Sequence, residues 1–277
     1  MKRLVLLFTL SLFCSFTGLA QSPADWLLGQ FAFMPRFANP NSYFNESSRR
    51  AYEFYGFEAT MTKDSVKQAE IWATRATGEM KFGNYDRAFA DFEKTVMLNP
   101  AWQGIIGWRY LFLFRDYPRA LAYLQAYDDR TPNFDDPIDD YSVNYLKGRA
   151  YAGMGQHDKA VQAYSVTIGD RSKRLGAEWV DYRYLVARGV SYLHLKKAAE
   201  GLADFDAALK NYPKSIMANY HKGRALEQLG RLEEAKTAFR DARFFLVSNH
   251  SFERDYYYEQ PDAAYEEDIE EALARLK

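Results

Sequence analysis

Two nearly identical octapeptides, 75 residues apart, constrain this chain more than any other feature. NYLKGRAY begins at Asn144 and NYHKGRAL begins at Asn219, and their first seven positions differ only where Leu146 stands opposite His221. Such a match indicates either one local site that the chain uses twice or the same corner of a repeated structural unit. The residues that follow each octapeptide separate these two explanations.

The segments downstream of the octapeptides also agree, which favours a repeated unit. The matched positions are Gly148 with Gly223, Gly155 with Gly230, Ala160 with Ala235, and Tyr164 with Phe239. A third segment begins at Tyr182, 34 residues before Ile216, and fits the same frame. Self-similarity at a period of this length is typical of helical-repeat proteins, in which each unit stacks on its neighbours.

Two further copies extend the pattern towards the N-terminus. Their marked positions are Trp72, Ala76, Gly83, Tyr85, Ala88, Phe92 and Pro100 in the first, and Tyr117, Ala120, Leu124 and Pro132 in a degenerate second. In the degenerate copy the turn between the helices is shorter, and Trp108 stands near the place of a small residue. The pattern resembles the tetratricopeptide repeat (TPR), a helix–turn–helix unit. The resemblance covers roughly residues 66–247, with an insertion around residues 171–180.

The repeated residues have physical roles in such a unit. A glycine or alanine at the eighth position lets the first helix lie close to the second, and Gly83, Gly155 and Gly230 end the first helix where a left-handed backbone favours glycine. Alanine and an aromatic residue one helical turn apart share a buried face of the second helix. The resemblance implies an all-α fold: a right-handed helical-repeat solenoid of about five TPR-like helix–turn–helix units with a C-terminal capping helix.

Both ends of the chain differ from the repeats. Residues 1–20 have the layout of a signal peptide, because Lys2 and Arg3 precede an apolar run and small residues precede the expected cleavage site. Residues 21–65 form an aromatic-rich extension in which we expect only short helices, one of them near residues 47–54. Residues 66–248 form the repeat array, and residues 249–277 form a connector and a capping helix. The capping helix has an apolar stripe of Ala264, Ile269, Leu273 and Leu276.

The leader predicts an exported protein, located in the periplasm or secreted, with outer-membrane association left open. A retained N-terminal anchor and a lipid on Cys14 are the alternatives to cleavage. Since Cys14 is the only cysteine, cleavage would remove disulfides, thiol nucleophiles and thiolate metal sites together.

Composition excludes some classes of function. Lys and Arg number 36 against 37 Asp and Glu, so the chain lacks the basic excess that nucleic-acid binding requires. No segment after the leader is apolar enough to span a bilayer. The 21 Tyr, 20 Phe and 5 Trp residues suit either packing between helices or contact with a partner, and composition does not separate these uses.

Two Tyr–Arg pairs are candidate binding residues. The members of each pair lie four residues apart, on one face of a first helix. In the tetratricopeptide family this face usually lines the groove that holds a peptide, and arginine suits carboxylates while tyrosine offers rigid contact area. The predicted groove residues are Tyr145, Arg149, Val186, Val190, His194, Tyr220 and Arg224. The alternative is that each arginine stacks on its tyrosine or pairs with an acid of the next helix.

A second basic position recurs in every copy. Position seven is Arg75, Arg109, Lys147, Arg188 or Lys222. We interpret it as a packed stem with its charged head in solvent. Chaperone-binding members of the family carry a carboxylate clamp, but Asn144 and Asn219 do not occupy the clamp's positions, so that function is not implied.

The sequence predicts no catalytic residue, metal site or cofactor. None of the four histidines belongs to an H-E-x-x-H pair, and no C-x-x-C motif or phosphate-binding glycine loop occurs. The acidic run DDPIDD at residues 135–140 lacks the spacing and the glycine of a calcium loop. We expect it to be an exposed connector that caps the next helix.

These observations predict a non-catalytic protein–protein interaction scaffold or adaptor of the bacterial cell envelope. It would bind a partner protein or peptide, including one with acidic groups, in the concave groove, with no nucleic acid. One alternative is a permanent structural subunit of an envelope assembly or secretion complex, docked through the aromatic N-terminal segment. A carbohydrate-related or enzymatic role is a further alternative. The course of residues 31–57, over the groove or away from it, would separate the first two.

Overall fold

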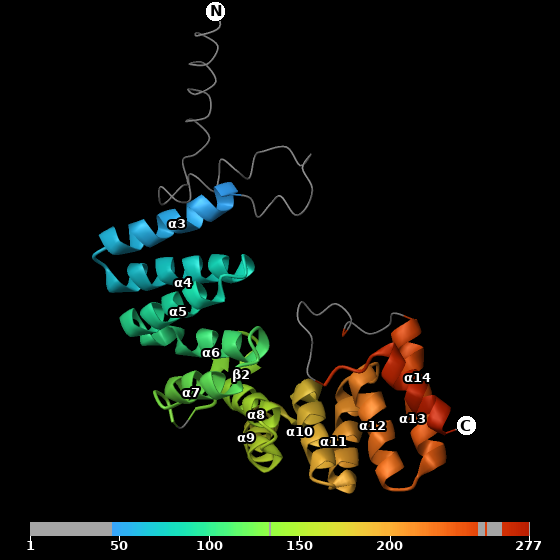
Figure 1. The fold of residues 1–277 in the computed structure, drawn as a ribbon. Coiled ribbons are helices and arrows are strands. Elements are labelled where there is room, and N and C mark those ends of the chain that lie inside the picture. The colour runs from blue at the N-terminus through green and yellow to red at the C-terminus, as the bar shows by residue number, and fades with distance from the viewer. Residues whose placement is uncertain (1–45, 133, 249–252, 254–261, 277) are drawn as a thin grey trace, which may run out of the picture. The chain divides into compact units, whose positions relative to one another are not determined.

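The computed structural model describes residues 46–132, 134–248, 253 and 262–276. The predicted signal peptide, residues 21–45 of the predicted aromatic extension and most of the predicted connector lie outside the described residues. The chain divides into two compact units, with the division between Trp102 and Gln103. Helices dominate both units (Figure 1), and none of the described helices has the length and apolar character needed to cross a membrane.

The first unit contains a helix that covers the first predicted repeat. Its elements are α3 (Glu46–Met61), α4 (Ser65–Lys81), α5 (Tyr85–Leu98) and the short 3-10 helix η2 (Pro100–Trp102). Helix α3 is longer than the predicted segment at residues 47–54, because Tyr55 and Ala59 are buried against Ile71 and Trp72 of α4. Part of the aromatic extension therefore caps the repeat.

The second unit contains four helix–turn–helix hairpins and a capping helix. The hairpins are α6 (Gln103–Phe112) with α7 (Tyr117–Asp128), α8 (Val143–Gly153) with α9 (His157–Leu175), α10 (Tyr182–His194) with α11 (Ala198–Asn211), and α12 (Ile216–Gln228) with α13 (Leu232–Val247). Before α8, β1 (Pro137–Ile138) pairs antiparallel with β2 (Tyr141–Ser142), with Ile138 opposite Tyr141. The predicted all-α, TPR-like class is thus confirmed.

Close approach of the two helices of a hairpin explains the small residue at position eight. A Cβ on Gly148 would lie 2.4 Å from the ring of Tyr164. The corresponding distances are 2.5 Å for Gly189 against Phe205 and 2.5 Å for Gly223 against Phe239. In the degenerate copy, Gly107 takes this role, since its Cβ would lie 2.9 Å from Leu124. The small residue is therefore present there, one position before Trp108.

The turns between helices follow the predicted backbone. Gly83, Gly155 and Gly230 have φ values of 76°, 72° and 73°. Lys196 occupies the equivalent turn after α10 with a φ of 61°. A lysine in this left-handed region carries a conformational cost that glycine does not.

The predicted insertion is mostly helical. Helix α9 continues to Leu175, and the 3-10 helix η3 (Ala177–Trp179) follows it. Asn211, at the end of α11, donates hydrogen bonds to the carbonyls of Ala177 at 2.9 Å and Val180 at 2.8 Å. The extra residues are therefore fixed to the following repeat.

The predicted capping helix is confirmed as α14 (Glu266–Arg275), and Ala264 of the predicted stripe lies before its first turn. Its start is set at Tyr265, whose backbone N–H donates to Asp268 at 3.0 Å. Ile269 and Leu273 are buried against α12 and α13, in the stripe that the sequence predicted.

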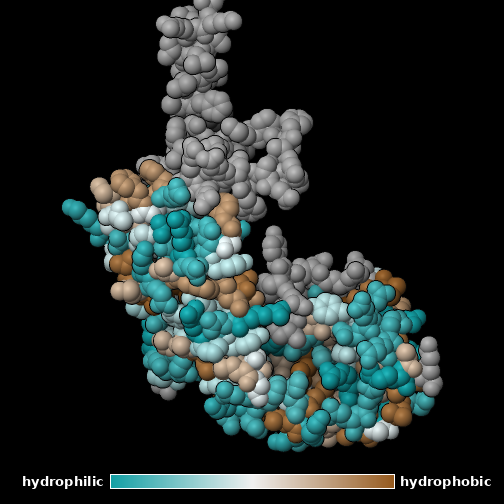
Figure 2. Space-filling model, in the orientation of Figure 1, coloured by the Kyte–Doolittle hydropathy of each residue, from teal (hydrophilic) through white to brown (hydrophobic). Residues whose placement is uncertain are grey.

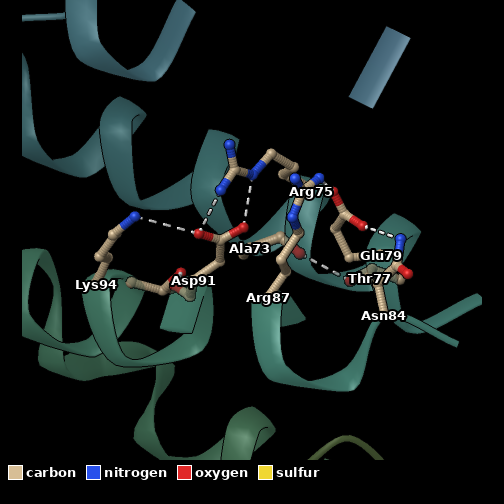
Figure 3. Close-up of polar contacts among 9 residues, drawn as sticks. Ala73, Arg75, Thr77, Glu79, Asn84, Arg87, Asp91 and Lys94 are labelled. Atoms are coloured by element: carbon tan, nitrogen blue, oxygen red, sulfur yellow. Dashed lines mark hydrogen bonds and ion pairs between the residues drawn. The ribbon is translucent and has the colours of Figure 1, made fainter. Parts of the chain in front are cut away.

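Four of the five basic residues predicted at position seven are paired with aspartates, which corrects the prediction of solvated heads for Arg75, Lys147, Arg188 and Lys222. Figure 3 shows Arg75 donating to Asp91 of the next helix, at 2.6 and 2.8 Å. Arg188 binds Asp204 in the same way, at 2.8 and 2.7 Å. In the two copies with a lysine at position seven, the residue sixteen positions later is alanine and not aspartate. Each of these lysines pairs with an aspartate of the preceding hairpin instead. These pairs are Lys147 with Asp128 at 2.8 Å and Lys222 with Asp206 at 2.7 Å. An aspartate sixteen residues after an arginine fixes the pair within one hairpin.

Candidate partner-binding site

The first helices of three hairpins meet in a pocket of about 350 Å³ in the second unit. Of the predicted groove residues, Arg149, Val190, His194, Tyr220 and Arg224 line it. They come from α8, α10 and α12, which present the same face because the repeat places them in the same register. Of the six residues at the fifth and ninth positions of these helices, four therefore line the pocket.

Two predicted groove residues do not reach the pocket surface. Tyr145 and Val186 are each only 1% exposed. The ring of Tyr145 lies between Tyr141, with centroids 5.5 Å apart, and Tyr184, at 4.4 Å. Burial raises the pKa of Tyr145 well above its ordinary value. These two side chains belong to the core beneath the pocket, whereas Tyr220, at the fifth position of its own copy, lines it.

Arg149 is buried and already has a partner. Its guanidinium binds the carboxylate of Asp262, which lies ahead of α14. Burial alone would lower the pKa of Arg149, but the charge and hydrogen bond of Asp262 raise it. Arg149 is therefore paired with an acid, as in the alternative interpretation, but the acid comes from the connector and not from the next helix.

Arg224 is in a different situation. It is half-buried, and among the described residues no acid pairs with it. Two carboxylates line the pocket, but Asp262 binds Arg149 and Asp268 accepts the backbone N–H of Tyr265. The pocket therefore holds one cation whose charge is not neutralised by a direct contact within the described part of the chain.

Three histidines line the pocket, of which the sequence predicted only His194. The rings of His157 and His194 stack with centroids 4.1 Å apart and an angle of 4°. His221 lies close by, and its Nε2 is 3.0 Å from the carbonyl oxygen of Asp262. Burial lowers the pKa of His221 to about 4, and burial together with His194 lowers that of His157. His157 begins α9 and His194 ends α10, so only stacking of the hairpins brings them together.

Several buried polar atoms in the pocket have no hydrogen-bond partner among the described residues. They are Nε of Arg149 and Nδ1 of His157 and of His221. Buried polar atoms are nearly always paired, so a cluster of exceptions calls for water or a ligand. Since Arg149 Nε–H and the Arg224 guanidinium can only donate, a ligand with acceptor oxygens fits these groups.

The acidic run before α8 is a helix cap, as predicted. Asp135 accepts hydrogen bonds from the Ser142 hydroxyl at 2.6 Å and from the Asn144 backbone and side-chain amides at 3.1 and 3.0 Å. In the second octapeptide, the Asn219 side chain instead donates to the carbonyl of Ser215 at 2.8 Å. The two asparagines that begin the octapeptides therefore have different local partners. Among the described residues, no group of three or more His, Cys, Asp or Glu side chains is arranged to hold a metal ion.

The family model described as tetratricopeptide repeat matches residues 145–216 and 186–245. Together with the hairpin geometry described above, this match identifies residues 145–245 as tetratricopeptide repeats. A search of curated protein sequences gives no significant match.

Solved structures of other repeat proteins share this fold. MamA from Desulfovibrio magneticus RS-1 has a TM-score of 0.55 and 17% identity, covering 66% of this chain and 97% of its own. BtubC from P. vanneervenii has a TM-score of 0.61 and 11% identity, covering 82% and 97%. YrrB, described as a TPR protein with an unusual peptide-binding site, has a TM-score of 0.50 and 15% identity, covering 70% and 93%. At these identities the similarity shows the fold alone.

Proposed function

We propose that this chain is a non-catalytic interaction module whose second unit binds a partner protein or peptide in the pocket lined by α8, α10 and α12. The observation that carries the proposal is the combination of Arg224, a cation without a direct acidic partner among the described residues, and buried donors around it that lack acceptors there. A carboxylate on the partner, from an acidic side chain or a chain terminus, satisfies both.

Support also comes from the fold. Repeat hairpins form extended binding surfaces from equivalent faces of successive helices, and YrrB is a structurally similar protein described as having a peptide-binding site. We further propose that the protein acts in the bacterial cell envelope, because residues 1–20 have the layout of an export signal.

The test begins with Arg224→Gln, which removes the charge and keeps most of the side-chain length. Arg130→Gln is the matched control, because Arg130 is an exposed arginine of the same unit that does not line the pocket. Arg149 is a poor probe, since its replacement by Glu would bury a carboxylate beside Asp262 and destabilise the fold.

The two variants and the unmodified chain are used to capture partners from envelope extract, with identification by mass spectrometry. A synthetic peptide from the captured partner is then titrated, with Asp or Glu in one version and Asn or Gln in the other. Losing a charge-assisted hydrogen bond costs about 1.5–3 kcal/mol, so Arg224→Gln should weaken the acidic peptide by about 10- to 100-fold. The control should leave the affinity unchanged.

A partner that all three proteins retain equally would overturn pocket binding. Such a result would favour the alternative of a structural subunit docked through the N-terminal segment. In α3 the side chains of Phe57 and Met61, which are 60% and 67% exposed, would be the described residues to examine next.

A further inference from the structure

The outer face of α13 carries cations beside exposed apolar side chains. Lys236, Arg240, Arg243, Phe244 and Val247 follow one another at helical spacing and line a shallow groove of about 670 Å³. Phe244 is 58% exposed and Val247 is 69% exposed. Figure 2 shows a mostly hydrophilic face for the second unit, broken by apolar patches. Large exposed apolar side chains that adjoin each other, unlike single ones, mark a contact surface.

Helix α14 covers only part of α13. Leu273 of α14 forms one edge of the groove, and Glu270 pairs with Arg243 at 3.4 Å. No acid among the described residues pairs with Lys236 or Arg240. The last helix of a repeat array needs a polar outer face to remain soluble, so the part of α13 that α14 leaves open is incomplete as a cap.

The exposed face of α14, beside this groove, is acidic. The buried stripe of α14 faces α12 and α13, which leaves Glu266, Glu267, Glu270 and Glu271 exposed. Within the described residues, no cation pairs with Glu266 or Glu267. One end of the molecule therefore presents a basic–apolar surface and an acidic surface side by side.

The direction of α14 determines where its acidic residues lie relative to the cations of α13. Helix α14 returns along α13, as the pairing of Arg275 with Glu227 at the end of α12 shows (Figure 1). Glu266 and Glu267 consequently lie near the C-terminal half of α13. An antiparallel meeting of two α13 helices around Phe244 and Val247 brings the cations of one copy towards the acids of the other.

We propose that the α13–α14 end binds a second copy of this chain in an isologous dimer. Phe244 and Val247 of the two copies form its centre, and Lys236 and Arg240 of each copy face Glu266 and Glu267 of the second copy. A surface that carries both signs of charge is complementary to itself under twofold symmetry, which is the commonest symmetry of homo-oligomers. The pocket lined by Arg224 is separate from this surface, so the proposal does not depend on the proposed function.

The test measures the oligomeric state of the full chain by sedimentation equilibrium at several protein and salt concentrations. We expect a dimer that weakens as salt rises, because exposed charge pairs are screened. Arg240→Glu and Glu267→Arg should each weaken dimerisation about tenfold or more, since each places like charges opposite one another twice. Val247→Asp should have the same effect by charging the centre of the contact.

Mixing the two charge-reversal variants gives the most specific result. In a heterodimer of Arg240→Glu with Glu267→Arg, both contacts again join opposite charges, so the mixture should dimerise although neither variant does alone. Lys210→Glu, a charge reversal at an exposed position of α11, is the control and should not affect association. Circular dichroism checks that each variant remains folded.

A chain that stays monomeric at all concentrations would overturn the proposal. So would a dimer that none of these substitutions weakens, or two charge-reversal variants that fail to associate when mixed while each is folded.

Discussion

The difference between the two octapeptides offers a substitution that the chain itself supplies. His221 is 5% exposed, and the equivalent Leu146 in the first octapeptide is fully buried. His221→Leu therefore introduces a side chain that the equivalent position of another repeat already accommodates. The substitution removes a buried titratable group and one hydrogen bond, from His221 to the carbonyl of Asp262.

The pKa of His221 gives the expected size and sign of the effect. Its pKa in the folded chain is lowered from 6.5 to about 4, chiefly by burial, opposed by Asp262 and assisted by Arg224 and His194. Between these values the unfolded chain binds more protons than the folded chain. His221 therefore costs nothing above pH 6.5 and destabilises the fold progressively as pH falls towards 4. By linkage the cost is about 2 kcal/mol at pH 5 and about 3 kcal/mol at pH 4.

At neutral pH the substitution His221→Leu should instead destabilise the fold. His221→Leu leaves the Asp262 carbonyl without its partner, which should cost about 1 kcal/mol. The stability curves of the two proteins should therefore cross between pH 7 and pH 5, with the leucine variant less stable at pH 7 and more stable in acid.

The assay is urea unfolding at several pH values, with the difference between the two proteins taken at each one. Other groups titrate in the same range, and the difference removes their shared contribution. Because the chain has two compact units, hydrogen exchange of α12 amides supplies a local readout. A difference that stays constant from pH 7 to pH 4 would refute the reasoning, as would an imidazole signal of His221 that titrates near its ordinary pKa.

Three further predictions concern the packing of the hairpins. Lys196→Gly should raise the thermal midpoint, with a gain of about 0.5–1 kcal/mol from relief of the left-handed backbone, and an unchanged or lower midpoint would contradict this. Gly148→Ala should lower the urea midpoint by the equivalent of about 1–3 kcal/mol, because the added methyl would meet the ring of Tyr164; equal midpoints would show that the two helices can separate at no cost. Asp204→Asn should cost about 3 kcal/mol, because it leaves a largely buried arginine charge without its counter-ion. Asp206→Asn, at a half-exposed ion pair, should cost under about 1 kcal/mol, and equal losses in denaturant unfolding would contradict the distinction.

The helical repeat and its internal packing were predictable from the sequence. Gly148 and Tyr164, like Gly223 and Phe239, are sixteen residues apart, and that offset is fixed by one helix, one turn and one further helix. The left-handed turn at Gly155 is equally local, since it depends on a single residue's backbone freedom. Contacts at a constant offset recur in every copy, so they leave a periodic signal in the sequence.

The content of the pocket depended on contacts that have no such period. Arg149 meets Asp262 from 113 residues away, and His157 meets His194 only because two hairpins stack. The sequence does not show that Tyr184 of the next hairpin packs on the ring of Tyr145, whereas Tyr220 at the same position stays half-buried. The sequence by itself determined the repeating unit and which helix faces line up, because those follow from local periodicity. Only the tertiary structure decided which side chains on that face are buried, paired or available to a partner, because these depend on the segments that pack against it from outside the repeat.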